Sequence, residues 1–182
     1  MKQINKYIIE RLHINKDIKS YNYNPKTADE LQELVDKLVK ERGNEADLND
    51  IDTSEITDMS YIFYKSKFNG DISEWDVSNV EDMSSMFYKS KFTGENGSIS
   101  NWDVSKVENM DSMFEYSSFN GDISKWDVSN VKDIEYMFYK SKFTAKNGDI
   151  SNWDVSNVKD MNNMFKGTSL EKNPPKWYLH KI

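Results

Sequence analysis

Two aromatic residues recur along the chain at fixed intervals, and this periodicity constrains the fold more than any other feature. Trp75, Trp102, Trp126 and Trp153 are separated by twenty-seven, twenty-four and again twenty-seven positions. A phenylalanine follows the same alternation of a longer and a shorter interval, at Phe63, Phe87, Phe114, Phe138 and Phe165. Internal similarity at a period of about 20 to 50 residues is typical of repeat arrays. We therefore expect five units that stack side by side, because a single unit is too small to bury its own apolar residues.

The long units differ from the short ones by three extra residues that always fall in one place. Residues 92–99 stand where a short unit has residues 68–72, and residues 143–150 repeat the insertion. An insertion confined to one point of a repeat is expected in a loop on one face of the array.

Each unit carries the pattern Trp-Asp-Val-Ser-Asn-Val-x-Asp-Met-x-x-Met-Phe. The β-branched and aromatic residues of segment 71–77 predict a short strand. The apolar spacing from Val80 to Phe87 predicts a short helical or 3₁₀ turn. One strand and one turn per unit match the leucine-rich-repeat period of about 20–29 residues. The predicted fold class is a repeat solenoid, leucine-rich-repeat-like and β-rich with short helical turns, with a helical N-terminal cap.

The sequence predicts three regions. Residues 1–50 form the helical cap, residues 51–170 the five-unit solenoid, and residues 171–182 a C-terminal cap segment. Within residues 1–50, an apolar stripe predicts an amphipathic helix over 1–14. A second helix is expected between a capping box at Thr27 and a stop at Gly43. An alternative function for this region is a docking or targeting helix.

Composition narrows the classes of partner. The net charge is −7, and both arginines, Arg11 and Arg42, precede the repeats, which argues against a nucleic-acid partner. The chain has no cysteine, so no disulfides are expected. It also lacks the run of roughly 20 apolar residues that a membrane-spanning helix needs, so no membrane span is expected. The N-terminal residues do not resemble a signal peptide.

The run from Trp75 to Phe87, Trp-Asp-Val-Ser-Asn-Val-Glu-Asp-Met-Ser-Ser-Met-Phe, and its repetition to Phe165 resemble the BspA-like leucine-rich-repeat surface-protein family. The resemblance covers about residues 51–170. It implies a bacterial surface module for adhesion or protein binding, without catalytic residues. Family units often carry a cysteine after the Met-Phe pair, where this chain has Tyr-Lys-Ser-Lys. The sequence itself, with no signal peptide or anchor, indicates a cytoplasmic or phage-associated protein, whereas the resemblance indicates the cell surface.

Catalytic chemistry has no evident place in the pattern. The two histidines, His13 and His180, lie outside the repeats, and no nucleophile–base set or phosphate loop is recognisable. We expect no enzyme activity, no cofactor and no metal.

One column of aspartates, at the same position in every unit, leaves two interpretations open. Either calcium is bound between units, or each carboxylate closes an Asx turn on backbone N–H groups, and we favour the turns. These aspartates are Asp52, Asp76, Asp103, Asp127 and Asp154.

The repeated tryptophans and methionines are expected in the core, although an exposed tryptophan column could stack against sugars. A more exposed feature is Tyr-Lys-Ser-Lys-Phe, at residues 64–68, 88–92 and 139–143. It is either a solvated lysine rim or a binding strip for an acidic protein or an anionic glycan. The candidate binding residues are Tyr64, Lys65, Lys67, Tyr88, Lys89, Lys91, Tyr139, Lys140 and Lys142.

The predicted function is thus a non-enzymatic, macromolecule-binding repeat module of the protein–protein or adhesion type. The alternative is a structural component of a larger assembly, such as a virion or a surface layer. The pattern sets no oligomeric state.

Overall fold

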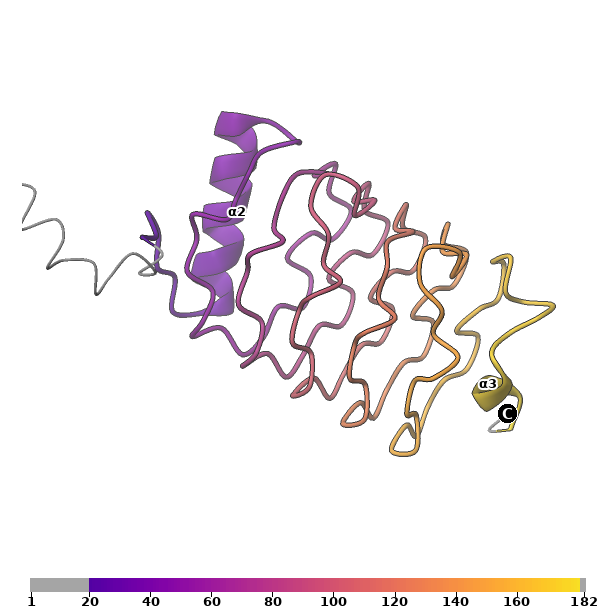
Figure 1. The fold of residues 1–182 in the computed structure, drawn as a ribbon. Coiled ribbons are helices and arrows are strands. Elements are labelled where there is room, and N and C mark those ends of the chain that lie inside the picture. The colour runs from indigo at the N-terminus through magenta and orange to yellow at the C-terminus, as the bar shows by residue number, and fades with distance from the viewer. Residues whose placement is uncertain (1–19, 181–182) are drawn as a thin grey trace, which may run out of the picture.

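The computed structural model describes residues 20–180 (Figure 1). The described part of the chain passes through helix α2 (Ala28–Arg42), continues through the repeat units, and then forms the short helix α3 (Lys176–Leu179). The units follow one another along one direction, from α2 to α3 (Figure 1). The helix predicted over residues 1–14 lies outside the described residues.

The prediction of a β-rich, leucine-rich-repeat-like solenoid is wrong. Residues 20–180 contain no β-strand of more than a single bridged residue and no sheet. Their helices are α2 and α3. Strand-like pairing is limited to isolated parallel bridges between single residues, such as Asp58 with Asp82 and Asp133 with Asp160. Segment 71–77, predicted as a strand, instead contains a turn that the Trp75 N–H closes on the Ile72 carbonyl, at 3.2 Å.

Short turns explain why no strand forms. In the second unit, Asp71, Asp76 and Asp82 each accept a hydrogen bond from the backbone N–H two residues later. Such Asx turns divert the backbone from an extended path. Because these three turns begin only five and six residues apart, the β-branched residues between them cannot extend into a strand.

The units are joined through a run of consecutive turns, which we call the turn segment (residues 83–90 in the second unit). Alternate N–H groups close the turns: Met86 donates to the Met83 carbonyl and Tyr88 to the Ser85 carbonyl. The intervening N–H groups donate to the next unit, for example from Phe87 to the Met113 carbonyl at 2.9 Å. The same alternation recurs in the first, third and fourth units. Backbone hydrogen bonds therefore connect the units without a sheet.

Positive φ angles distinguish the turn segment from the predicted helical or 3₁₀ turn. Ser85 and Lys89 have φ of 53° and 52°, and the equivalent residues of the other units are also left-handed. A right-handed helix cannot include such residues. The apolar spacing from Val80 to Phe87 therefore reflects burial in successive turns, not a helical period.

Columns of large side chains run the length of the array and form its core. One column consists of nearly parallel phenylalanine rings, with successive centroids 5.4–5.9 Å apart and planes within 5°. Its members are Phe63, Phe87, Phe114, Phe138 and Phe165. The prediction that tryptophans and methionines are buried is confirmed, and the alternative of an exposed tryptophan column for sugars is wrong.

The tryptophan column also satisfies buried backbone groups. Each indole N–H donates to a backbone carbonyl that lies 27 or 30 positions earlier in the chain, at 2.9–3.3 Å. The last of these indoles belongs to Trp177, which lies twenty-four positions after Trp153 and stacks on it at 6.3 Å. The tryptophan pattern therefore continues beyond residue 170 to Trp177, and the regular spacing of the tryptophans could have revealed this.

Helix α2 lies at the first end of the array (Figure 1). It begins after Thr27, whose hydroxyl accepts from the Glu30 N–H at 3.2 Å, and ends at Gly43, where φ is 94°. Leu31, Val35 and Leu38 are buried and belong to the same core as the repeats. No helix among the described residues has the length and apolar character to cross a membrane.

Candidate functional site

The predicted tyrosines and half of the predicted lysines come together on one edge of the array. The Tyr64 and Tyr88 rings stack at 4.8 Å with their planes 10° apart. The row continues through Tyr116, whose ring meets those of Tyr88 and Tyr139 edge-on at 6.2 and 5.5 Å. We call this surface the Tyr/Lys strip. It consists of Tyr64, Lys65, Tyr88, Lys89, Tyr116, Tyr139 and Lys140.

Lysine ammonium groups lie over or between the tyrosine rings of the strip. The Lys89 Nζ is 4.9 Å from the centres of both the Tyr88 and Tyr116 rings. The Lys140 Nζ lies 5.5 Å from Tyr116 and 5.0 Å from Tyr139. These distances fall within the cation–π range of about 6 Å. The side chains of the strip therefore hold one another in place before any partner arrives.

The backbone of the turn segment determines this arrangement. Lys65, Lys89, Tyr116 and Lys140 all occupy its second left-handed position, with φ between 50° and 55°. The N–H of each donates to the next unit, as from Lys89 to the Glu115 carbonyl at 2.8 Å. A repeated backbone conformation thus projects one side chain per unit onto the same edge.

The strip lysines remain available to a partner. Interaction with the Tyr88 hydroxyl, followed by nearby tyrosines, raises the pKa of Lys89 above its ordinary value. The Tyr139 hydroxyl and Tyr116 have the same effect on the pKa of Lys140. Both side chains therefore stay protonated at neutral pH. Among residues 20–180, the ion pairs that form are elsewhere, such as Arg42 with Asp50, and none involves a strip lysine.

The other three predicted lysines, Lys67, Lys91 and Lys142, lie in a separate row. Each of these lysines comes two residues after a strip lysine in the sequence. The residue between the two lysines is a serine, which is buried in most units. Backbone hydrogen bonds connect this row, since the Lys91 N–H donates to the Ser66 carbonyl at 3.0 Å. These three ammonium groups make no cation–π contact with the strip.

Sequence reasoning missed Tyr116, Tyr61 and Tyr136. Tyr116 stands at the lysine position of a unit whose tyrosine position holds Glu115, so this unit departs from the motif. Tyr61 and Tyr136 extend the surface by edge-on contacts with Tyr64 and Tyr139, at 5.5 and 5.4 Å. Aligning the units on phenylalanine would have revealed that Tyr61 and Tyr136 are equivalent. That Tyr116 continues the row could not be read from the alignment.

The strip is the main exposed aromatic surface of the described residues. Tyr61, Tyr64 and Tyr116 are 54%, 38% and 40% exposed, and the remaining exposed large apolar residue is Leu179. Exposed aromatic groups that lie together are characteristic of interaction sites.

The aspartate column forms Asx turns, as predicted. In every unit the carboxylate accepts from the backbone N–H of the serine two residues later, at 2.9–3.1 Å. Within residues 20–180, no three acidic or histidine side chains are grouped so as to hold a metal ion.

Comparison with known proteins gives one family. No curated protein and no solved structure matches the chain. A family model described as "Mycoplasma protein of unknown function, DUF285" matches residues 29–146 and again residues 89–182. These two matches overlap within the repeats and together cover most of the chain, so the protein belongs to the DUF285 family.

Proposed function

We propose that this protein is a non-enzymatic, macromolecule-binding module of the adhesion type, and that the Tyr/Lys strip contacts the partner. The observation that carries the proposal is the row of tyrosine rings with ammonium groups between them. Tyrosine is enriched at binding hot spots because it offers a large contact area at a low cost in conformational entropy.

The strip is suited to a partner that carries anionic groups. Its ammonium groups have no acidic partner among the described residues, while the chain as a whole has a net charge of −7. A positive row on an acidic protein favours one orientation of approach, because the rest of the surface repels the same anionic partner. An acidic protein surface and an anionic glycan share this chemistry.

Two sequence arguments support the adhesion type and the absence of catalysis. The repeats resemble the BspA-like surface-protein family, which implies a partner at a cell surface. The units also repeat the same side chains at equivalent positions, whereas an active site needs a unique set of groups.

The test compares two triple variants with equal changes in charge. Lys65→Ser, Lys89→Ser and Lys140→Ser together remove the strip ammonium groups. The control variant, with Lys37→Ser, Lys125→Ser and Lys159→Ser, removes three exposed ammonium groups elsewhere. Binding of each purified chain to immobilised host-cell surface extract is measured by biolayer interferometry at physiological and at high salt.

We expect the strip variant to lose at least tenfold in affinity while the control stays within about twofold. High salt should weaken wild-type binding, since exposed charges are screened. A strip variant that melts and binds like the wild type would refute the proposal. A wild-type chain that sediments as a large homogeneous assembly, and becomes monomeric in the strip variant, would instead support a structural role in a virion or surface layer.

A further inference from the structure

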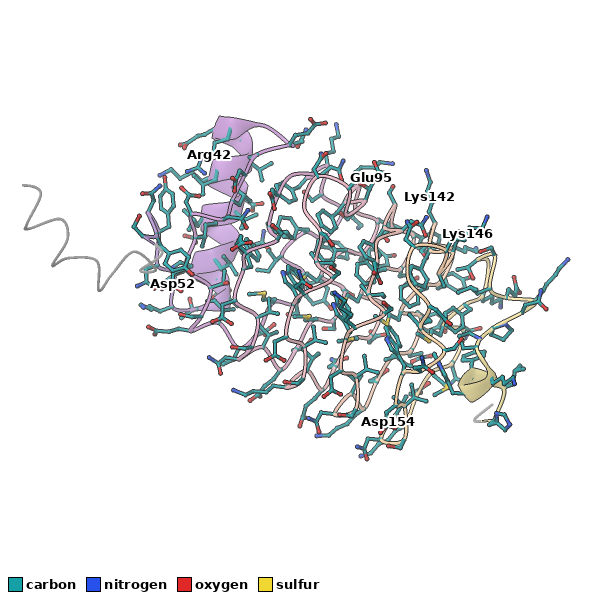
Figure 2. All side chains as sticks on the ribbon, in the orientation of Figure 1. Arg42, Asp52, Glu95, Lys142, Lys146 and Asp154 are labelled. Carbon is teal, nitrogen blue, oxygen red and sulfur yellow. The ribbon has the colours of Figure 1, made fainter. Side chains whose placement is uncertain are left out.

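The two long loops border a polar recess that the Tyr/Lys strip does not include. The loops, residues 93–98 and 144–149, lie on either side of the short turn at Asn120 and Gly121. The recess has a volume of about 390 Å³. It is lined by Thr93, Glu95, Ser118, Asn120, Lys142 and Asn147. Figure 2 shows Glu95, Lys142 and Lys146 along one edge of the molecule and Asp154 on the opposite edge.

Two features of the sequence create this recess: long and short units alternate, and one unit has a serine where most others have a lysine. The long units raise its two walls, and the short unit between them forms its floor. Ser118 stands at the floor, where three of the other four units have Lys67, Lys91 and Lys142 and the last unit has Ser169. The backbone at this position is the same throughout: Ser118, Lys91 and Lys142 each donate to the preceding unit at 3.0–3.1 Å. The space therefore depends on the short side chain of Ser118.

Hydrogen bonds fix the floor and one wall. The Asn120 Oδ1 accepts from the Thr144 N–H and from the Thr144 hydroxyl, each at 2.9 Å. The Asn147 side-chain amide donates to the Asn120 carbonyl. These bonds orient both asparagines without using the Asn120 Nδ2 or the Asn147 Oδ1.

Both hydrogen-bond donors and hydrogen-bond acceptors of the recess remain available to a ligand. Among the described residues, the Asn120 Nδ2, the Ser118 hydroxyl and the Lys142 ammonium have no acceptor. The Asn147 Oδ1 and the Glu95 carboxylate likewise have no donor. The lining contains no apolar side chain.

We propose that this recess binds an uncharged sugar residue of a glycan. A sugar hydroxyl both donates and accepts, so neighbouring hydroxyls can satisfy a mixed set of donors and acceptors. One carboxylate and one ammonium give no net charge, which favours a neutral ring over an acidic one. The volume lies within the range of small-ligand pockets, about 300–1,000 Å³. An apolar peptide side chain would leave the polar and charged groups of these side chains without partners.

Ser118→Lys is the direct test of the site. It restores the residue found in three other units, and the backbone already accommodates lysine at this position in those units. It should therefore fill the recess and leave the fold intact. Asn101→Lys adds the same charge at an exposed position where the next unit has Lys125, and serves as the control. Asn120→Asp keeps an oxygen for Thr144 and replaces the amide donor with a negatively charged acceptor.

Binding is measured by two-dimensional ¹H–¹⁵N NMR of the full chain. The probes are lactose, maltotriose and chitotriose as neutral sugars, a hyaluronan tetrasaccharide as an acidic one, and a peptide of alternating glutamate and serine. We expect a neutral probe to shift the amide signals of residues 93–97, 118–121 and 144–148. Ser118→Lys should abolish these shifts, Asn120→Asp should weaken binding at least threefold, and Asn101→Lys should have no effect.

Three outcomes would overturn the proposal. The first is that no neutral probe shifts these signals. The second is that the shifts persist in Ser118→Lys. The third is that, among the probes, only the peptide produces shifts that Ser118→Lys removes. A hyaluronan response that persists in Ser118→Lys and disappears in the strip variant belongs to the Tyr/Lys strip. The recess and the strip are thus tested independently, and either can fail alone.

Discussion

Two aspartates of the repeats, Asp103 and Asp111, have pKa values that are shifted in opposite directions. Burial, together with Asp133, Glu115 and Asp160, raises the pKa of Asp111. The hydroxyl and the backbone N–H of Ser105 lower the pKa of Asp103. Ionisation of Asp111 therefore opposes folding, whereas ionisation of Asp103 favours it.

This difference predicts opposite pH effects for two variants. Asp111→Asn should raise the melting temperature at pH 7, because the folded carboxyl binds its proton more readily than the unfolded one. The gain should shrink as the pH falls toward about 4, where the unfolded group also becomes protonated. Asp103→Asn should lower the melting temperature at pH 7, and this loss should fade as the pH falls below the ordinary aspartate pKa. Thermal melts from pH 3 to 8 measure both, and shifts of the same sign would contradict the assignment.

At the scale of the element, the turn segment replaces the strand and helix that its sequence predicted. Left-handed residues recur at two positions per unit, and most are not glycine. A non-glycine residue in this conformation costs about 1 kcal/mol or more. The last unit has Gly167 at one of these positions, with φ of 78°. Hydrogen bonds to the neighbouring unit must offset this cost in the other units.

Two serines in the same turn segment provide a matched test. Ser85 is left-handed, so Ser85→Gly should raise the free energy of unfolding by up to about 1 kcal/mol. Ser84 has no positive φ, so Ser84→Gly should lower it by about 0.5–1 kcal/mol. Urea denaturation measures both values. If both glycines destabilise equally, the left-handed backbone of this segment is wrong.

At the scale of the whole molecule, each unit completes the core of its neighbours. The Phe114 ring lies 5.5 Å from Phe87, 5.7 Å from Phe138 and 4.1 Å from Phe119. Because the contacts join three successive units, damage at one unit affects the adjacent ones. The array should therefore unfold as one cooperative structure.

Phe114→Ala should lower the free energy of unfolding by about 3–5 kcal/mol. Far-UV circular dichroism and tryptophan fluorescence should shift together, because the tryptophans lie in the units on both sides. Leu179→Ala, at a site that is 57% exposed, is the control and should change stability by less than about 0.5 kcal/mol. Separate transitions for the two probes would show that the units unfold independently.

Periodicity alone identified the core, because a side chain that recurs at the same position of every unit meets its equivalents when the units stack. The burial of Trp75 and Phe87 could be predicted in this way, whereas the Asx turn at Asp76 and the helix after Thr27 could be predicted from local residue types and spacings. Each depends on residue type and on neighbours within a few positions or one period.

Tertiary structure alone decided the path of the backbone and the surface that it presents. The left-handed backbone of the turn segment is held by N–H groups that donate to the next unit, as from Lys89 to the Glu115 carbonyl. Tyr116 joins the strip because its left-handed backbone projects the ring toward Lys89 of the preceding unit and Lys140 of the following one. The recess over Ser118 exists because two long loops face a short turn. These features arise from contacts between units, which no single repeat contains.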